Sequence, residues 1–359
     1  MTPDSEVQTR RQFLRQQLAP VALAGLGIAG LKPRLREKHA EPAQGELVSL
    51  SRIAMACRWE IMLPADDEGA LPAAQAALEL VGDLERQMSV FREDSEISAI
   101  NRRAAREPVA VESELFGLLE LAARLARETD GAFDISAGAL ARLWRSCRSE
   151  SRVPREDEVE RARTAAGMDS VRLDHDARTV AFARDGLLLD LGASGKGYAL
   201  DCVCASLRSA GVTRALVHAG HSSIAAVGNP PWDSAWTVGI AGAAGGEHVT
   251  PARMRDRCMA TSGATEQFYE ADGKRYGHII DPRTGWTAEG ALSATVIASA
   301  AAEADALSTA FYITGTEATQ AYCAAHPNVG ALLVLEDEAG GKTRALSVGI
   351  ENDVLEVTV

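Results

Sequence analysis

Asp305 and Thr309 stand four residues apart in an alanine-rich stretch, and their spacing is one that can hold a metal ion. The stretch 300–314 favours a helix, in which residues four apart share one face, so a carboxylate and a hydroxyl would lie together. Two oxygens on one helical face suit a hard cation such as Mg²⁺, which commonly brings a phosphate with it. From the spacing alone, a capped amphipathic helix with a solvated Asp is the simpler interpretation.

A second group of polar residues lies in the segment 276–285, shortly before this helix. Pro282 and Gly285 predict a sharp turn there, so His278 and Asp281 are expected on a loop rim. Histidine is the side chain whose ordinary pKa lies near neutrality, which makes His278 the candidate general base. A single histidine beside a strand is usually only hydrogen-bonded, and that alternative stands beside the catalytic one.

A glycine-rich loop lies between two expected elements in the middle of the chain. The apolar run 187–191 predicts a strand, and the segment 196–210 predicts a helix that ends at Gly211. A strand, a glycine-rich turn and a helix in this order can cradle a phosphate, although the spacing of a Walker loop is absent. Lys196 opens the helix, and its ammonium could offset the charge of a diphosphate.

These segments resemble, together with others, the ApbE-type family of FAD:protein FMN transferases. The similarity covers roughly residues 55–315 in six segments that keep the family's order. The six segments are 88–98, 129–134, 189–199, 219–224, 260–263 and 276–309. Any one of them would be weak support, whereas six in order make a strong match.

The resemblance implies an enzyme that cleaves the diphosphate of FAD and transfers FMN to a Thr hydroxyl of a partner redox protein, with release of AMP. In the family, Mg²⁺ is held by the residues that match Asp305 and Thr309 and by the backbone carbonyl that matches Ala193. The residues that match the family's flavin-nucleotide contacts are Met55, Phe91, Ala132, Phe133, Asp134, Asp190, Lys196 and Ile279. For the apolar members, core packing is the alternative. His278 would activate the incoming Thr.

Two departures from the family pattern concern the expected flavin site. His221 stands where the family usually has a glycine, and Phe91 stands where it commonly has a tyrosine, which keeps a stacking face but loses a hydroxyl. Two other functions therefore stay open. Water could replace Thr as the nucleophile, which gives an FAD diphosphatase, or His221 could block the acceptor and leave a protein that only holds FAD.

The composition of the chain indicates which kind of partner is unfavourable and which state the cysteines adopt. The 359-residue chain is 46% hydrophobic and carries a formal net charge of -13, which argues against nucleic acid, because phosphate-backbone binding needs a basic face. Its six cysteines lack the spacings of a zinc site or a disulfide scaffold, so free buried thiols are expected.

The N-terminus carries the pattern of a twin-arginine export signal. Arg10 and Arg11 are followed by Phe13 and by the apolar run 18–31, which is shorter than the roughly 20 residues of a membrane-spanning helix. We therefore expect an exported protein that is periplasmic or anchored at the outer face of the inner membrane. Contact with the membrane is expected only through this segment, if it is not cleaved.

Hydrophobic periodicity places the remaining elements and the domain. Helices are predicted over 73–88 and 112–129, and a third acidic one is predicted to begin after Pro154. Strands are predicted over 53–63, 171–173, 179–182, 215–219, 224–227, 236–240, 259–262, 267–270, 292–298, 331–335, 347–350 and 354–359. The predicted helices and mostly antiparallel strands follow one another without a regular βαβ repeat, which indicates an α+β fold. We expect a signal over 1–31, a linker over 32–47 and one domain over 48–359. The resemblance implies that this domain is an ApbE-like, T-fold-related flavin transferase domain with flanking helices.

Overall fold

The computed structural model describes residues 46–67, 69–241, 249–263, 268–336, 343–351 and 354–355, all within the compact unit Pro42–Val359. The predicted signal and all but the end of the predicted linker lie outside these residues, and the first strand begins at Leu47. Within the described ranges, every helix is too short or too polar to cross a bilayer.

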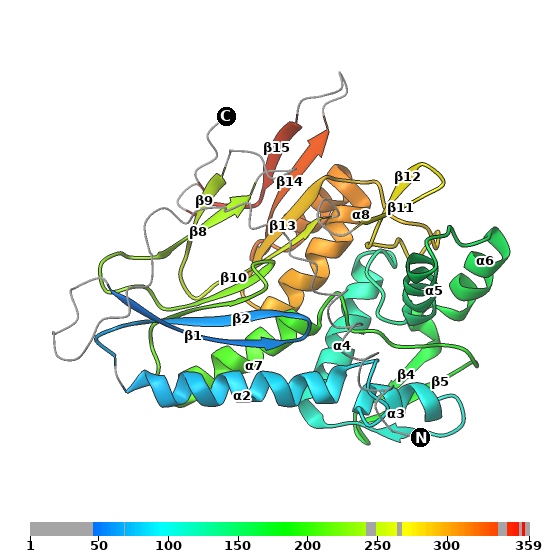
Figure 1. Ribbon diagram of the computed structural model, residues 1–359, viewed down its shortest axis with the longest axis horizontal. Coiled ribbons are helices and arrows are strands. Elements are labelled where there is room, and N and C mark those ends of the chain that lie inside the picture. The colour runs from blue at the N-terminus through cyan, green and yellow to red at the C-terminus, as the bar shows by residue number, and fades with distance from the viewer. Residues whose placement is uncertain are drawn as a thin grey trace, which may run out of the picture. The chain divides into compact units, whose positions relative to one another are not determined.

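A sheet of eight strands forms the centre of the unit, and each neighbouring pair in it is antiparallel. In spatial order the strands are β1 (Leu47–Ala54), β2 (Cys57–Pro64), β6 (Ala215–Ala219), β7 (Ser223–Val227), β10 (Cys258–Gly263), β13 (Ser293–Ala298), β14 (Gly330–Glu336) and β15 (Thr343–Val348). Helices cover this sheet (Figure 1), so the predicted α+β class with mostly antiparallel strands is confirmed.

The two faces of the sheet bury different cores, because successive strand residues point to opposite sides. In β7, Ala225 and Val227 join the large core, whereas Ile224 and Ala226 join a smaller one. The large core is completed by α2 (Ala70–Met88), α7 (Gly195–Ser209) and α8 (Ala301–Ala325), and the smaller core by the hairpin of β8 (Trp236–Ala241) and β9 (Val249–Met254). The central strands β6 and β7 are therefore buried on both faces, whereas the edge strands β1 and β15 are largely exposed.

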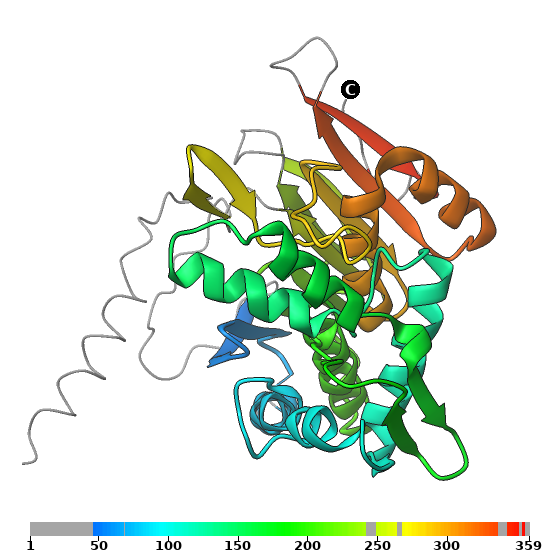
Figure 2. The ribbon, with the colours of Figure 1, turned by 90° about the vertical axis from the view of Figure 1, so that its right-hand side faces the viewer.

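The remaining elements surround the large core on the side shown in Figure 2, where α5 and α6 face the viewer. The helices are α3 (Glu96–Arg103), α4 (Ser113–Glu128), α5 (Gly138–Ser149) and α6 (Glu156–Ala165), with a short 3₁₀ turn at Met168–Ser170. The small sheets are β3 (Val109–Ala110), β5 (Thr179–Phe182) and β4 (Val171–Asp174), and the hairpin of β11 (Phe268–Ala271) and β12 (Lys274–Gly277).

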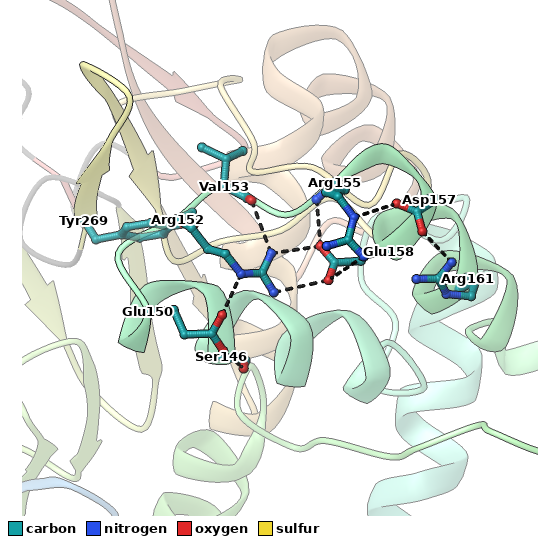
Figure 3. A network of polar contacts seen from close by, with 9 residues as sticks. All are labelled: Ser146, Glu150, Arg152, Val153, Arg155, Asp157, Glu158, Arg161 and Tyr269. Atoms are coloured by element: carbon teal, nitrogen blue, oxygen red, sulfur yellow. Dashed lines mark hydrogen bonds and ion pairs between the residues drawn. The ribbon is translucent and has the colours of Figure 1, made fainter.

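A polar network joins the end of α5 to the start of α6 and to β11 (Figure 3). The Arg152 guanidinium donates to the carboxylates of Glu150 and Glu158 at 2.6 and 2.8 Å. The Tyr269 hydroxyl donates to the Arg152 carbonyl at 3.1 Å. Three chain segments thus converge on one residue, which fixes the C-terminal end of α5.

Most predicted elements are confirmed, including the helix over 112–129. The single strand predicted over 53–63 is wrong, because Met55 and Ala56 adopt left-handed backbone angles and turn the chain into the β1–β2 hairpin. The strand predicted over 187–191 is also wrong. That segment forms one bridge, between Leu188 and Ala137, and is otherwise without a strand partner in the described part of the chain.

Candidate active site

Asp305, on α8, lies at the junction with α7 and is 5% exposed. Its Oδ2 atom accepts a hydrogen bond from the Gly197 backbone N–H at 3.0 Å, and its Oδ1 atom accepts one from the Ser223 hydroxyl at 3.2 Å. The Lys196 ammonium lies 3.8 Å from Oδ1. The structure therefore brings together two of the predicted site residues, Lys196 and Asp305, from distant parts of the sequence.

The close approach of α7 and α8 is what allows this arrangement. A Cβ atom at Gly197 would lie 2.2 Å from the Ala301 carbonyl oxygen, so the contact requires a residue without a side chain. The Asp201 carboxylate accepts the backbone N–H groups of Ala301 and Ala302 at 2.8 and 2.9 Å. A side chain of α7 thus caps the N-terminus of α8. Burial raises the pKa of Asp201 above its ordinary value, although these two hydrogen bonds oppose the shift.

Hydroxyl groups surround the next turn of α8. The Thr309 hydroxyl lies 3.2 Å from that of Ser262, which is also 2.8 Å from the Ser308 hydroxyl. With Asp305 one turn away, the local donor atoms are all oxygens, which is the chemistry that Mg²⁺ prefers. The carboxylate accepts two hydrogen bonds and has capacity for more, since it offers about four lone-pair positions.

The donor set limits what kind of ion could bind here. Among the described residues, no group of three or more His, Cys, Asp or Glu side chains could hold a metal ion. An ion at this position would therefore depend on one carboxylate, that of Asp305, together with neutral oxygens and oxygens from a ligand. Such a site suits Mg²⁺, which usually keeps waters and shares phosphate oxygens with a substrate.

Ala193 lies in the glycine-rich loop that enters α7. The backbone N–H groups of Ser194 and Gly195 both donate to the Leu191 carbonyl, at 3.0 and 2.7 Å, and so form a tight turn. The Ser194 hydroxyl is buried and has no hydrogen-bond partner within the described ranges. The loop ends directly at Lys196, so the backbone of Ala193 and the ammonium of Lys196 are held by one compact turn.

Asp190 and Phe91 lie together at a pocket of about 520 Å³ between α3, α5 and the segment 188–190. The Arg145 guanidinium donates to Asp190 Oδ2 at 2.9 Å and lies 5.1 Å from the centre of the Phe91 ring. Phe91 is 78% exposed. A backbone N–H of the glycine-rich loop, that of Gly192, donates to Asp190 Oδ1 at 2.9 Å, so the pocket wall is continuous with that loop.

The segment 132–134 has mainly structural contacts. The side chains of Ala132 and Phe133 are buried in the large core. The Asp134 carboxylate accepts hydrogen bonds from the backbone and hydroxyl of Ser136, at 2.7 and 2.6 Å, and from the backbone of Met168 at 3.2 Å. Burial raises the pKa of Asp134, against these hydrogen bonds. This carboxylate holds its own turn in place.

Three further predicted residues lie on turns and segment ends. Met55, half-buried, donates its backbone N–H to the Glu85 carboxylate at 2.9 Å. Ile279 is buried in the large core, and its neighbour His278 is exposed just after β12.

The turn after Ile279 is closed by its own ion pair. The Arg283 guanidinium donates to both oxygens of Asp281, at 2.9 and 2.8 Å, so these two charges satisfy each other. The Gly285 carbonyl accepts a hydrogen bond from Trp144 Nε1 at 2.8 Å, which attaches the turn to α5. The charges of this segment therefore shape the loop that follows His278.

His221 lies in the β6–β7 turn with a left-handed φ of 64°. Its ring stacks on that of His218 at a centroid distance of 4.4 Å. His218 Nε2 lies 3.3 Å from a Glu60 carboxylate oxygen. Burial, and after it His221, lowers the pKa of His218, although Glu60 opposes the shift. The turn leads within two residues to Ser223, which contacts Asp305.

Sequence reasoning missed several residues that complete the site. Ser223 and Ser262 lie inside two of the six segments that resemble the family. The sequence therefore carried a signal for them, but it did not indicate their contacts with Asp305 and Thr309. Asp201 could have been suspected as a helix cap only after α8 was known to lie beside α7. Arg145 had no sequence signal, since it belongs to none of the six segments.

The chain is similar over most of its length to known proteins of one family. The model of the ApbE family matches residues 55–333. The FAD:protein FMN transferase of Treponema pallidum is 33% identical over 88% of this chain and 89% of its own length, and that of Escherichia coli K12 is 28% identical over 85% and 88%.

Two solved structures extend the comparison to the fold. The ApbE protein of Thermotoga maritima has a TM-score of 0.75 and 31% identity, covering 83% of this chain and 96% of its own. The flavin transferase ApbE of Vibrio cholerae has a TM-score of 0.73 and 28% identity, covering 84% and 97%. Because the family model and both kinds of relative cover most of the chain, this protein is a member of the ApbE family.

Proposed function

We propose that this protein is an FAD:protein FMN transferase, which moves FMN from FAD to a Thr hydroxyl of an acceptor redox protein and releases AMP. The observation that carries the proposal is the buried Asp305 carboxylate, 3.8 Å from the Lys196 ammonium and beside the glycine-rich loop. It stands in a chain whose relatives are named FAD:protein FMN transferases.

The chemistry assigned to this site is phosphoryl transfer, which depends on positioning and charge neutralisation. The Thr oxygen bonds to the phosphorus of the FMN half while the bond from that phosphorus to the AMP oxygen breaks. AMP leaves with the bond's electron pair, and the Thr proton passes to His278, the exposed histidine after β12. Lys196 offsets the negative charge of the diphosphate.

Asp305, Thr309 and the Ala193 carbonyl are the groups that would hold Mg²⁺, which when bound neutralises diphosphate charge. The oxygen-only donors at the α7–α8 junction support this assignment. Phe91, Asp190, Lys196, Met55 and Ile279 are assigned to the flavin nucleotide. Ala132, Phe133 and Asp134 complete this set through their backbone, since their side chains serve the core and their own turn.

We also propose that the protein is exported by the twin-arginine route and acts in the periplasm or at the outer face of the inner membrane. The Arg10-Arg11 pattern and the following apolar run support this location. All six cysteines are free thiols in the structure, which suits a protein that folds in the reducing cytoplasm before export. Cell fractionation of the wild type and of an Arg10→Lys, Arg11→Lys variant tests it, and an unchanged distribution of the variant would count against it.

The transferase is tested by incubating the full chain with FAD, Mg²⁺ and a protein domain that carries an acceptor Thr. We expect the acceptor to gain the mass of one FMN and AMP to accumulate in equal amount, with both lost in Asp305→Ala. AMP without a mass gain would identify a diphosphatase. The absence of AMP with several acceptors would identify a protein that only holds FAD.

A further inference from the structure

The helix that carries Asp305 begins without a capping side chain of its own. α8 starts at Ala301, and its N-cap residue is Ala300, whose methyl group cannot accept a hydrogen bond. Helices commonly have Ser, Thr, Asp or Asn at this position, because the first backbone N–H groups have no partner within the helix. The N-terminal end of α8 therefore depends on another element.

Asp201, on α7, supplies the missing acceptor. Its Oδ1 and Oδ2 atoms accept the backbone N–H groups of Ala301 and Ala302, at 2.8 and 2.9 Å. In the opposite direction, the Gly197 backbone N–H of α7 donates to Asp305 Oδ2 at 3.0 Å. Gly197 and Asp201 are four residues apart on α7, so they share one face, and Asp305 follows Ala301 by the same spacing on α8. Each helix thus donates backbone N–H groups to a carboxylate of the other.

The packing of the two helices fixes their distance, whereas the orientation of α8 needs a second contact. The backbones touch where a Cβ atom at Gly197 would lie 2.2 Å from the Ala301 carbonyl oxygen. One point of contact alone would let α8 rotate about it, and the paired hydrogen bonds of Asp201 oppose that rotation. The first turn of α8 also has an ion pair of Glu303 with Arg124, at 3.0 Å. The Arg124 side chain is 41% exposed, so this pair contributes little.

The orientation of α8 matters because a metal ion is sensitive to the position of its ligands. Mg²⁺ requires a near-ideal octahedron of oxygens at about 2.0–2.1 Å. A functional site has to be held within about 0.5 Å of its working geometry, so a small rotation of α8 displaces Asp305 too far. Loss of a group that orients metal ligands without touching the metal typically costs about 10–100-fold in affinity or activity.

We propose that Asp201 is a positioning residue that sets the affinity of the Asp305 site for Mg²⁺ by holding α8 on α7. The inference rests on the proposed function, which assigns Mg²⁺ to Asp305, Thr309 and the Ala193 carbonyl. Ala193 lies in the loop that enters α7, whereas Asp305 and Thr309 lie on α8. The contact between the helices therefore determines how the donors from the two sides stand relative to each other.

The test measures metal binding to the full chain without turnover. Mn²⁺ is the probe, because it prefers the same oxygen ligands as Mg²⁺ and its free form is detected by electron paramagnetic resonance. We expect the Kd of Mn²⁺ to rise at least about tenfold in Asp201→Ala. Asp201→Asn should lie between this variant and the wild type, since its amide keeps one acceptor oxygen. Asp305→Ala should abolish binding at the site.

Two further variants separate positioning from charge and from folding. Glu303→Gln removes the same charge from the first turn of α8 and should leave the Kd within about twofold. Ala300→Ser, added to Asp201→Ala, gives α8 a capping hydroxyl of its own that makes no tie to α7. The midpoint of urea unfolding should fall in Asp201→Ala and return toward the wild-type value in the double variant. The Kd of Mn²⁺ should stay raised in both.

Three results would overturn the proposal. The Kd in Asp201→Ala could equal that of the wild type, Glu303→Gln could raise it as much, or Ala300→Ser could restore it together with stability. The last result would make Asp201 an ordinary helix cap. Failure of the metal assignment itself would be seen separately, as wild-type Mn²⁺ binding that survives in Asp305→Ala, and would remove the inference with it.

Discussion

The α7–α8 junction and the pocket between α3 and α5 meet at the glycine-rich loop but are built in opposite ways. At the junction, Asp305 is 5% exposed and receives hydrogen bonds from a backbone N–H and a hydroxyl. At the pocket, Phe91 is 78% exposed, and Arg142 has no partner among the described residues. The groups assigned to the reacting phosphate are buried and fixed, whereas the arginines and the aromatic ring that line the pocket stay in solvent.

The difference has an energetic basis. Electrostatic contacts are stronger in a buried site than at a solvated surface, so each group at the junction has a large effect. Exposed ion pairs are each worth about 0–1 kcal/mol, so the pocket can act only through the sum of several groups. Substitutions at the junction should therefore change the reaction rate and the folding, whereas substitutions at the pocket should change ligand binding.

The largest effect is expected for Asp305→Ala. Removing a preorganised group that stabilises transition-state charge costs about 10²–10³-fold in rate, so FMN transfer should fall by at least this factor. AMP release and acceptor mass report the rate, and circular dichroism checks the fold. Asp176→Ala, an exposed carboxylate in the β4–β5 turn, should keep the wild-type rate. Near-normal transfer by Asp305→Ala would show that the junction is not the site of chemistry.

A smaller effect, on stability, is expected for Gly197→Ala. The added Cβ atom would meet the backbone of Ala301, which cannot move without separating the two helices, so the free energy of unfolding should fall by about 1–3 kcal/mol. Gly117→Ala in α4 is the matched control, because a Cβ atom there meets nothing within 4 Å. This control should gain up to about 1 kcal/mol from helix propensity. Urea unfolding of both variants measures the two changes in the free energy of unfolding, which should have opposite signs. Equal changes would contradict the steric explanation.

The sequence predicted well those features of the site that local geometry determines. Asp305 and Thr309 share a helical face because the helix period alone places them there. The contact of Lys196 with Asp305 depends on how α7 packs against α8, and no spacing in the sequence encodes it. The same holds for Asp201, which caps a helix other than its own.

The prediction failed where the backbone conformation or the strand partner is not determined by nearby residues in the sequence. The β1–β2 turn at Met55 and Ala56 has left-handed angles without glycine or asparagine, so no turn signal marked it. The run 187–191 is apolar because it is buried, yet it pairs through one bridge only, and composition cannot distinguish these cases. The arginines of the pocket come from α3, from α5 and from the loop before α3, and each alone is an ordinary surface residue.

A pH effect of intermediate size is expected on the buried side, at His218. Its pKa is lowered in the folded protein, mainly by burial, so the unfolded chain binds the proton more readily. This contribution to stability is fully present above the ordinary histidine pKa of about 6.5 and is lost as the pH falls below it. Urea unfolding at several pH values between about 5 and 8 should show the loss, and His218→Gln should reduce it. An identical pH profile in the variant would contradict this assignment.

The smallest effect on folding is expected for Phe91→Ala, at the exposed end of the comparison. The ring is largely in solvent, so the free energy of unfolding should change by no more than about 0.5 kcal/mol. Phe91 is assigned to the flavin nucleotide, and an aromatic pair is worth about 0.5–1.5 kcal/mol, so the Kd of FAD should rise about twofold to tenfold. Phe91→Tyr keeps the ring face and should bind FAD like the wild type. A loss of stability comparable to that of Gly197→Ala would mean that Phe91 belongs to the core, and the contrast between the two regions would then fail.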